Sequence, residues 1–461
     1  MARLSSPDWI VLILYIIVLY GSAFYHSRAG RKNLDSFILA GRKLGLPGFI
    51  ATLVATWYGG ILGVGENTFR YGIQTWFIFG LPYYIFAMCF AWWVAPRIRR
   101  FEFRSIPDHF GRTSGPAARV FSSLFVILLA SPAPYILSIG ILLHFLFPIP
   151  FVPALWLAGL VSVLYIWYGG FGAVVRTDMV QFILMFTGFF LVVAFAWHQA
   201  GNPVQIWSQL PAAHRSLFGG KPFSYILVWF FIALWTFVDP GFYQRCAAVR
   251  DPGLARRGIL WSVLFWFIFD SLTLLAGLYA RVLLTTDQPL FVFPLLGQAV
   301  LPPVFLGLFL VSLLAILMST IDSLGLISAI TIGQDLWGLK NTNSGSKSIR
   351  RIQVGLIVAV VLAVLLAWMI PSVVNLWYVL GSLVIPGLLM PFLLTFTSWR
   401  LTARQVQTLL VAPTLVSLAW WLGKSRFPEL FRGEPFYPGL AVSLGLTAVF
   451  FGIRTFISKL S

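Results

Sequence analysis

The chain has 461 residues, of which 59% are hydrophobic and 10% are charged, and its formal net charge is +18. Soluble domains are about 45–50% apolar and about 25% charged, so this composition excludes an ordinary water-soluble fold. The basic residues lie in short clusters between apolar stretches, where membrane-orientation signals occur, and this placement argues against nucleic-acid binding. Cys89 and Cys246 provide neither a disulfide framework nor a zinc site.

Apolar stretches of about 20 residues, the length that carries a helix across a bilayer, recur along the whole chain. The first stretch ends near Tyr25 and is followed by Arg28, Arg31 and Lys32, so we interpret it as a retained span with a stop-transfer signal. The pattern predicts an all-α polytopic membrane protein. Its thirteen predicted spans cover residues 8–26, 47–70, 74–96, 117–146, 151–170, 177–199, 223–244, 256–284, 303–336, 350–370, 373–398, 403–423 and 437–457.

The loops between the predicted spans alternate in charge. Cytoplasmic loops carry an excess of lysine and arginine. Most of the 32 basic residues fall on one side, which is therefore predicted to be cytoplasmic; they lie in residues 28–43, 97–119, 245–257, 340–351, 400–404 and 454–459 and at Arg176. An odd number of spans then places the amino terminus outside and the carboxyl terminus inside, in an inner or plasma membrane.

Two predicted spans contain residues that interrupt helices. Span 47–70 has four glycines in the run WYGGILGVGEN, and span 223–244 has Asp239, Pro240 and Gly241 in the run WTFVDPGFYQR. The two spans are five apart in the chain, so they cross the membrane in opposite directions, as two inverted repeats require. Transporter sites commonly lie between such paired breaks. The glycines could instead serve close helix packing.

Four stretches of the chain carry a resemblance to a known family: DSFILAGRKLG, YGGFGAVVRTDMVQ, YQRCAAVRDPGLARRG and AILMSTIDS. In this order they resemble the sodium:solute symporter family, which includes sodium-coupled transporters of proline, sugars, pantothenate and sialic acid. The resemblance implies a leucine-transporter-like fold with a five-plus-five inverted repeat that works by alternating access. It divides a single transmembrane domain into residues 1–46 (an extra helix and a cytoplasmic loop), 47–199 (first repeat), 223–423 (second repeat) and 437–461 (last helix).

Sodium is held by a compact cage of oxygen atoms, which hydroxyls and the free main-chain carbonyls of an interrupted helix can provide. Ser319 and Thr320 lie in the middle of the ninth predicted span and supply such hydroxyls. The resemblance implies that they bind Na+ together with the carbonyls of Ile316, Ala55 and Tyr58. Taken alone, the same hydroxyls could bond back to their own helix.

An acidic residue placed centrally in a span costs about 2.5–3.5 kcal/mol, and such a cost usually indicates function. Asp270 has no basic residue within one helical turn, which makes it the strongest candidate for contact with a solute. Glu66 could meet an ammonium group, a hydroxyl or a proton, or it could pair with Arg70 on the same helical face. The acidic residues within or at the ends of predicted spans are Glu66, Asp178, Asp239, Asp270 and Asp322.

Asp178 has two interpretations. Together with Asp322 and Ser323 it resembles an additional sodium site of some family members, which would imply two sodium ions per cycle. Alternatively, Asp178 caps the start of its helix together with Gln181. The residues alone favour neither.

Trp235 stands where the family places an aromatic gate beneath the solute. Its neighbour Thr236 offers a hydroxyl, and Asp239 lies at the break that follows. A tryptophan that only packs is equally consistent with this position.

These features predict a secondary transporter that couples uptake of a small solute to sodium. Its expected partners are the solute, Na+ and the lipid bilayer, with no obligate protein partner and no nucleic acid. No enzyme is indicated, because the five histidines lack ligand spacing and the chain has no phosphate loop or nucleophile elbow. Proton coupling through the acidic residues and a transporter-like solute sensor are the alternatives.

The expected class of solute follows from charge. No lysine or arginine lies near the middle of a predicted span, whereas several acids do. This distribution favours a neutral, zwitterionic or cationic solute over an anion. Amino acids and their derivatives are therefore expected first, and sugars or polyols second.

Overall fold

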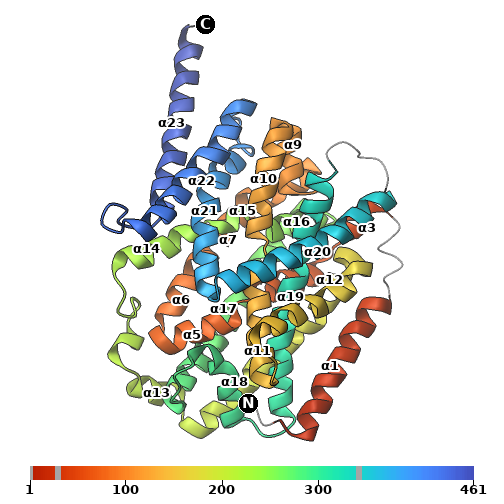
Figure 1. The fold of residues 1–461 in the computed structure, drawn as a ribbon, viewed down its shortest axis with the longest axis vertical. Coiled ribbons are helices and arrows are strands. Elements are labelled where there is room, and N and C mark those ends of the chain that lie inside the picture. Colours follow the sequence, from red (N-terminus) through yellow and green to blue (C-terminus); the bar gives the residue numbers. More distant parts are fainter. Residues whose placement is uncertain (1–3, 26–32, 339–344, 461) are drawn as a thin grey trace.

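The computed structural model describes residues 4–25, 33–338 and 345–460 (Figure 1). Over these residues the protein is helical and has no strand, and an isolated bridge joins Leu44 to Val249. The predicted all-α class is confirmed. Four basic residues of the predicted cytoplasmic loops lie outside the described residues: Arg28, Arg31, Lys32 and Lys340.

The helices follow one another through the chain with short connections. The first half contains α1 (Ser6–Tyr25), α3 (Leu34–Leu39), η1 (Ala40–Arg42), α4 (Leu46–Trp57), α5 (Ile61–Tyr71), α6 (Gln74–Phe79), α7 (Leu81–Trp93), α8 (Ala95–Phe101), α9 (Ile106–Ser114), α10 (Pro116–Leu129), α11 (Ala133–Leu146), α12 (Phe151–Ala200), α13 (Pro203–Gln209) and η2 (Ala212–Arg215). The second half contains α14 (Phe223–Ile232), α15 (Trp235–Val238), α16 (Pro240–Ala248), α17 (Pro252–Leu283), η3 (Pro289–Phe291), α18 (Val292–Val300), α19 (Phe305–Ile330), η4 (Thr331–Leu336), α20 (Gly345–Met369), α21 (Val373–Leu394), α22 (Ala403–Arg426) and α23 (Phe436–Leu460).

Many of these helices can cross a membrane. Within the described ranges, nine are long and apolar enough to do so, or ten if the bent pair α4 and α5 forms one span. Shorter apolar helices cover Ser6–Ser22, Phe151–Val161, Pro289–Val300 and Phe436–Gly452. The chain is therefore a multi-pass membrane protein. The count of thirteen spans and the inverted repeat stay predictions.

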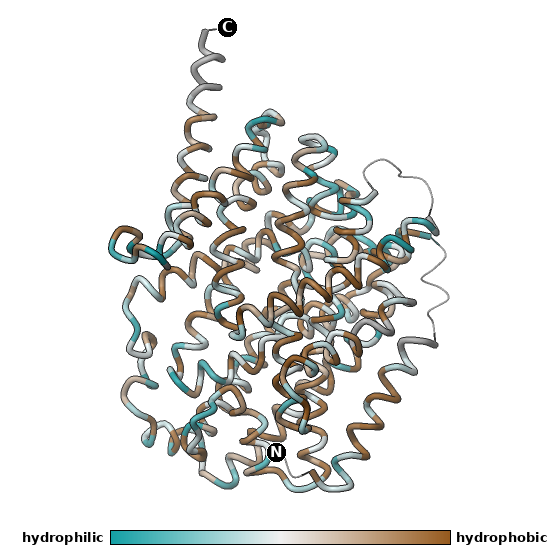
Figure 2. Tube along the Cα trace, viewed as in Figure 1, coloured by the Kyte–Doolittle hydropathy of each residue, from teal (hydrophilic) through white to brown (hydrophobic). Residues whose placement is uncertain are grey.

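The molecule is apolar both at its centre and on its outer helices. Helix α19 is buried almost without interruption from Leu306 to Ile330 and packs along α12. By contrast, α1 lies at the side of the bundle and leaves Ile10 65% and Ile17 62% exposed. Figure 2 shows hydrophobic residues along this outer helix. Apolar side chains exposed in this way indicate contact with lipid.

Both predicted helix breaks are present. Helices α4 and α5 meet at 56° across a short turn that contains Gly59 and Gly60. Helix α15 ends at Val238, and Asp239 then caps α16, with its carboxylate accepting the main-chain N–H of Phe242 at 2.8 Å. Within a membrane, such non-helical backbone is tolerated only where it is buried in protein or lines a cavity.

The predicted division at residue 170 is present, but the second span begins earlier than predicted. The sequence predicts separate spans at 151–170 and 177–199; α12 (Phe151–Ala200) turns sharply at Gly170, where φ is 56° and ψ is −155°, and the second apolar span covers Gly169–Ala200. Glycine adopts this backbone conformation readily. A Cβ atom at Gly170 would also overlap the carbonyl oxygen of Phe37. The chain therefore changes direction at one residue and needs no loop there.

Candidate functional site

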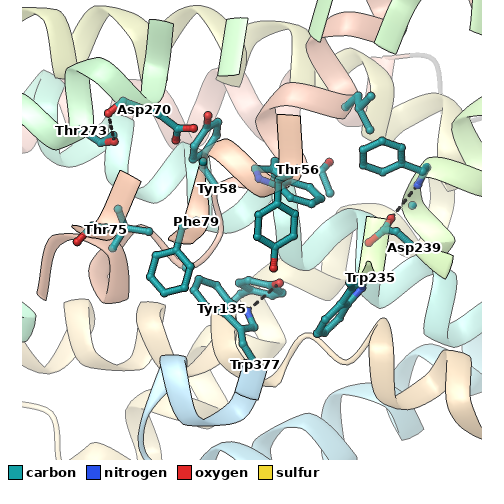
Figure 3. A pocket seen from close by; sticks show the side chains of 18 of the residues that line it. Thr56, Tyr58, Thr75, Phe79, Tyr135, Trp235, Asp239, Asp270, Thr273 and Trp377 are labelled. Carbon is teal, nitrogen blue, oxygen red and sulfur yellow. Dashed lines mark hydrogen bonds between the residues drawn. The ribbon is translucent and has the colours of Figure 1, made fainter. Parts of the chain in front are cut away.

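A cavity of about 120 Å³ lies between the two broken helices and helices α7, α11, α17 and α21 (Figure 3). Its size suits a small solute, since a cavity of roughly 150 Å³ can hold benzene. Aromatic rings form much of the wall. They belong to Trp57, Tyr58, Trp76, Phe79, Tyr83, Tyr135, Trp235, Phe242 and Trp377.

The break between α4 and α5 allows neighbouring helices to approach its main chain. A Cβ atom at Gly60 would overlap the indole ring of Trp377, and one at Gly59 would lie 2.5 Å from the Cβ atom of Thr320. The Nε1 atom of Trp377 donates to the hydroxyl of Tyr135 at 3.4 Å, and these two rings lie side by side in the cavity wall (Figure 3). The glycines therefore combine a helix break with close packing.

Replacement of Gly60 by alanine tests this packing. The added methyl group overlaps the Trp377 ring, so we expect the variant to lose about 1–3 kcal/mol of stability through overpacking. Gly445→Ala in α23 is the matched control, because no atom lies within 4 Å of a Cβ at that position. Thermal unfolding in detergent micelles measures both variants. A Gly60 variant as stable as the Gly445 variant would contradict the contact.

The hydroxyls predicted to bind sodium meet other oxygens where α19 passes α4. The Thr320 hydroxyl donates to the main-chain oxygen of Thr56 at 2.9 Å and lies 3.2 Å from that of Ile316. The Ser319 hydroxyl donates to Oδ1 of Asp178 at 2.6 Å. Each hydroxyl oxygen still has lone pairs that a cation can use. Buried oxygen atoms are therefore concentrated at this point.

The carbonyls implied as sodium ligands lie at the end of α4. Ala55 belongs to the last turn of that helix, where carbonyls have no partner within their own helix, and Tyr58 follows it. The carbonyl of Tyr58 accepts the N–H of Ile61 at 2.9 Å. Thr56, which lies between Ala55 and Tyr58 in the chain, contacts Thr320 directly through its carbonyl, so this end of α4 lies against α19. Ion binding by this set stays a prediction.

A wholly buried arginine lies beside these residues. The Nη2 atom of Arg245 lies within hydrogen-bond distance of the hydroxyls of Thr56 at 2.7 Å, Ser323 at 2.8 Å and Thr52 at 2.9 Å. The same atom is 3.9 Å from Oδ2 of Asp178. Arg245 also lines the cavity. Groups from α4, α12 and α19 therefore hold the guanidinium at the edge of the candidate site.

One expectation about basic residues is wrong. The sequence pattern predicts Arg245 in a cytoplasmic loop. In the structure, the apolar segment continues past the break at Asp239 from Phe223 to Ala248, so Arg245 lies within it. The buried charge is accommodated because hydroxyls and a carboxylate from other helices surround it.

Asp178 does not cap a helix. It lies inside α12, where its Oδ2 atom accepts a hydrogen bond from the hydroxyl of Thr52. Gln181, the other half of the predicted cap, donates to the hydroxyl of Tyr15 at 3.2 Å. Because this part of the helix already begins upstream at the Gly170 turn, the amides near Asp178 are not first-turn donors. The capping interpretation is therefore wrong.

The predicted second sodium site is only partly assembled. Asp178 and Ser323 both lie beside the guanidinium of Arg245. Neither carboxylate oxygen of Asp322 has a hydrogen-bond partner among the described residues, although the side chain is fully buried. A positive charge from the protein thus already lies next to two of the three residues. A second sodium ion stays a prediction.

Three of the residues predicted to contact solute line the cavity, namely Trp235, Asp239 and Asp270. In Figure 3, the two carboxylates lie on opposite sides of the aromatic wall. Asp270 accepts a hydrogen bond from the hydroxyl of Tyr84, which comes from α7. The sequence has no basic residue within one helical turn of Asp270, so its partner is expected from elsewhere in the chain. The structure supplies that partner from α7.

Two other predicted residues do not reach this wall. Thr236 is buried, but it is not among the residues that line the cavity. Glu66 pairs with Arg70 at 3.1 Å on the surface of α5, and its side chain is 28% exposed. The ion pair that one interpretation of Glu66 expects is therefore present. A role for Thr236 in the gate stays a prediction.

Comparisons with known proteins point to one family. The model of the sodium:solute symporter family matches residues 37–404. The sodium/proline symporter of Staphylococcus aureus (strain NCTC 8325 / PS 47) is 24% identical over 481 aligned positions, which cover 96% of this chain and 91% of the relative.

Solved structures share the fold. A Na+-coupled sialic acid symporter in a substrate-bound outward-open state has a TM-score of 0.77 at 17% identity, and the match covers 96% of both chains. Mhp1, a nucleobase-cation-symport-1 family transporter in a closed conformation with bromovinylhydantoin bound, has a TM-score of 0.58 at 14% identity, covering 91% of this chain and 95% of Mhp1. At these identities the likeness shows the arrangement of helices alone, which is that of leucine-transporter-like proteins.

Proposed function

Because this chain belongs to the sodium:solute symporter family, a family of sodium-coupled transporters, we propose that it is a secondary active transporter in which sodium entry drives uptake of a small organic solute by alternating access. One observation carries the proposal. The Thr320 hydroxyl of α19 contacts the Thr56 carbonyl at the end of broken α4, directly beside a cavity lined by both broken helices. Hydroxyls and freed carbonyls are the oxygens from which transporters build sodium sites.

The proposed cycle follows from this contact. Sodium between Ser319, Thr320 and the end of α4 stabilises the packing of α19 against the break and favours the outward-open cavity. Solute then binds between the breaks, the outer side closes and the inner side opens. Each sodium charge that moves inward gains about 2.3 kcal/mol per 100 mV of membrane potential, which is sufficient to drive accumulation of a solute.

The proposed orientation rests on the distribution of basic residues. The loops that hold most of them are assigned to the cytoplasm, so the amino terminus lies outside and the carboxyl terminus inside the cell membrane. Arg245 no longer counts toward this bias, because it is buried within a span. The remaining basic clusters at 97–119, 250–257 and 347–351 lie on the same predicted side, so the proposed orientation is unchanged.

The proposed solutes are amino acids and their derivatives first, which carry an ammonium group, and sugars or polyols second. The cavity wall contains two carboxylates, Asp239 and Asp270, and one guanidinium, Arg245. The guanidinium is already engaged by hydroxyls, whereas the described contact of Asp270 is with a tyrosine and not with a base. A cationic head group from the solute would therefore balance Asp270, and the aromatic wall would pack around its apolar part.

The related Staphylococcus aureus protein, named a sodium/proline symporter, also supports an amino acid as solute. The direct experiment is uptake of a panel of labelled amino acids, sugars and polyols into proteoliposomes under an inward sodium gradient. We expect accumulation of at least one amine-bearing solute with sodium and none with potassium. Uptake of a dianion with no zwitterion accepted in competition would contradict the proposed solute class.

Replacement of Asp270 by asparagine tests the role of its charge. We expect the apparent affinity for the amine-bearing solute to fall at least about tenfold, because a buried ammonium loses its counter-charge. Asp287→Asn, at an exposed position outside the cavity wall, is the matched control. Concentration-dependent uptake measures both variants. Unchanged affinity in the Asp270 variant would remove this residue from the site.

A proton-coupled transporter of the same fold is the second candidate. The observation that favours it is Asp322, a fully buried carboxylate whose oxygens have no hydrogen-bond partner within the described part of the chain. Membrane carboxylates of this kind occur in proton relays. Uptake driven by an inward proton gradient without sodium would favour this candidate, whereas binding of solute without transport under either gradient would favour a sensor.

A further inference from the structure

A second cavity, of about 540 Å³, lies at the end of the bundle where α9 and α22 are found, at the top of Figure 1 and opposite the end with α13 and α18. It is lined by α8 and α9, by the end of α21, by the start of α22 and by the connection between these last two helices. It shares no lining residue with the candidate solute cavity. A ligand bound here therefore occupies a site separate from that of the solute.

The wall of this second cavity is strongly basic. Four arginines contribute to it, namely Arg97, Arg100, Arg112 and Arg400, and no aspartate or glutamate among the described residues lines it. Part of this charge is balanced nearby, because Nε of Arg112 donates to Oδ1 of Asp108 at 3.1 Å. Arg97 and Arg100 have no ion pair with a carboxylate among the described residues, and their positive charge fits an anion. The planar guanidinium group matches the geometry of phosphate oxygens.

The side chain of a buried histidine in the same wall has no hydrogen-bond partner among the described residues. The His109 side chain is 1% exposed and is surrounded by aromatic rings, with that of Phe103 4.6 Å away between centroids. Its Nδ1 atom has no hydrogen-bond partner within the described ranges. Burial lowers the pKa of His109 to about 4, so the ring is neutral at pH 7 and offers one N–H donor and one acceptor nitrogen. Such a group fits a hydroxyl or phosphate oxygen of a ligand.

The other part of the wall is apolar. Pro391 and Leu394 come from the end of α21, while Trp399 and Leu401 come from the connection that follows it. The Trp399 side chain is 49% exposed. Tryptophan is enriched where membrane proteins meet the headgroup region of the bilayer. The cavity therefore combines an anion-binding side with a side suited to acyl chains.

We propose that this cavity binds an anionic phospholipid, with the arginines around its phosphate, His109 bonded to a headgroup oxygen and the apolar side against its acyl chains. Basic pockets between transmembrane helices bind such headgroups in other membrane proteins. The bound lipid links α9 to the connection between α21 and α22. Occupancy therefore stabilises this end of the bundle, whether or not sodium or solute is present.

The experiment compares the full-length protein in nanodiscs of phosphatidylcholine alone and of phosphatidylcholine mixed with phosphatidylglycerol. We expect a higher Tm in the mixed nanodiscs and a retained phosphatidylglycerol molecule by native mass spectrometry. Glycerol 1-phosphate added to the phosphatidylcholine nanodiscs supplies the same phosphate chemistry without acyl chains. An equal rise in Tm with glycerol 1-phosphate would overturn the proposal that the ligand is a lipid and would identify a soluble organophosphate instead.

Variants separate this site from general charge effects. Arg100→Gln/Arg400→Gln removes two exposed basic side chains, and we expect the apparent affinity for phosphatidylglycerol to fall roughly tenfold or more. Arg215→Gln/Arg432→Gln removes the same charge from exposed positions outside the cavity wall and should leave the affinity unchanged. His109→Phe keeps an aromatic ring and should also weaken binding. Equal phosphatidylglycerol affinity in all variants would overturn the proposal, whatever the sodium dependence of the protein.

Discussion

Arg245→Met is expected to lower the stability of the protein by about 3–5 kcal/mol, the usual cost of removing one partner from a buried ion pair. The guanidinium is fully buried and donates to hydroxyls from α4 and α19. Its loss leaves the Asp178 carboxylate without a positive charge within 4.0 Å among the described residues. Thermal unfolding in detergent micelles should show a clearly lower Tm.

Two further variants control this result. Arg245→Met/Asp178→Asn removes both charges, so it should recover part of the stability that the single variant loses. Arg250→Gln removes an arginine whose side chain is 71% exposed, and its loss should cost little. If Arg245→Met proved as stable as Arg250→Gln, the buried network would have no role in holding α16 against α4 and α12.

The second large effect is expected on sodium. Ser319→Ala/Thr320→Ala removes both hydroxyls of the proposed ion site, and we expect the affinity for sodium to fall by more than about tenfold. Changing groups that only support metal ligands already costs about 10–100-fold in affinity, and direct ligands should cost at least as much. Binding of radioactive sodium to the purified protein in a scintillation proximity assay measures the change.

A control variant separates lost ligands from lost packing. Thr320 also donates to the Thr56 carbonyl, so its removal weakens the contact between α19 and α4 as well. Ser312→Ala in the same buried helix is the matched control, because its hydroxyl bonds only to the carbonyl of Phe309 among the described contacts. Sodium affinity that is equal in the double variant and the Ser312 variant would place the ion elsewhere.

The parts of the site that are predictable from sequence are those with local signals. Adjacent glycines and an Asp-Pro-Gly run disfavour a continuous helix, so the breaks at Gly59 and Asp239 are predictable without a structure. The adjacent hydroxyl side chains of Ser319 and Thr320 are also a local signal, because they stand in an otherwise apolar helix. The family resemblance adds the carbonyls of α4 and the expected fold, and in the structure this end of α4 lies against α19.

The parts that sequence reasoning missed depend on contacts between distant segments. Arg245 follows an apolar run directly, so it resembles a loop residue until Thr52, Thr56 and Ser323 are known to surround it. The hydroxyl of Tyr84, which meets Asp270 from 186 positions away in the chain, has no local signal either.

The interpretation of Asp178 shows the same limit. Whether this residue caps a helix or lies inside one depends on where the helix begins. A single glycine at position 170 turns the chain without a loop, and no polar stretch marks that turn. The sequence therefore leaves both interpretations open; the backbone around Gly170 excludes the cap, and the second sodium site stays a prediction.

The most direct test of sodium coupling is the thermal stability of the wild-type protein in detergent at equal concentrations of sodium chloride and potassium chloride. An ion that binds only the folded protein stabilises it by mass action, by about 2.7 kcal/mol at a hundred times its Kd. We predict that Tm rises with sodium and not with potassium, and that the rise is lost in Ser319→Ala/Thr320→Ala. Equal Tm values in the two salts over the whole concentration range would contradict sodium binding and with it the proposed mechanism.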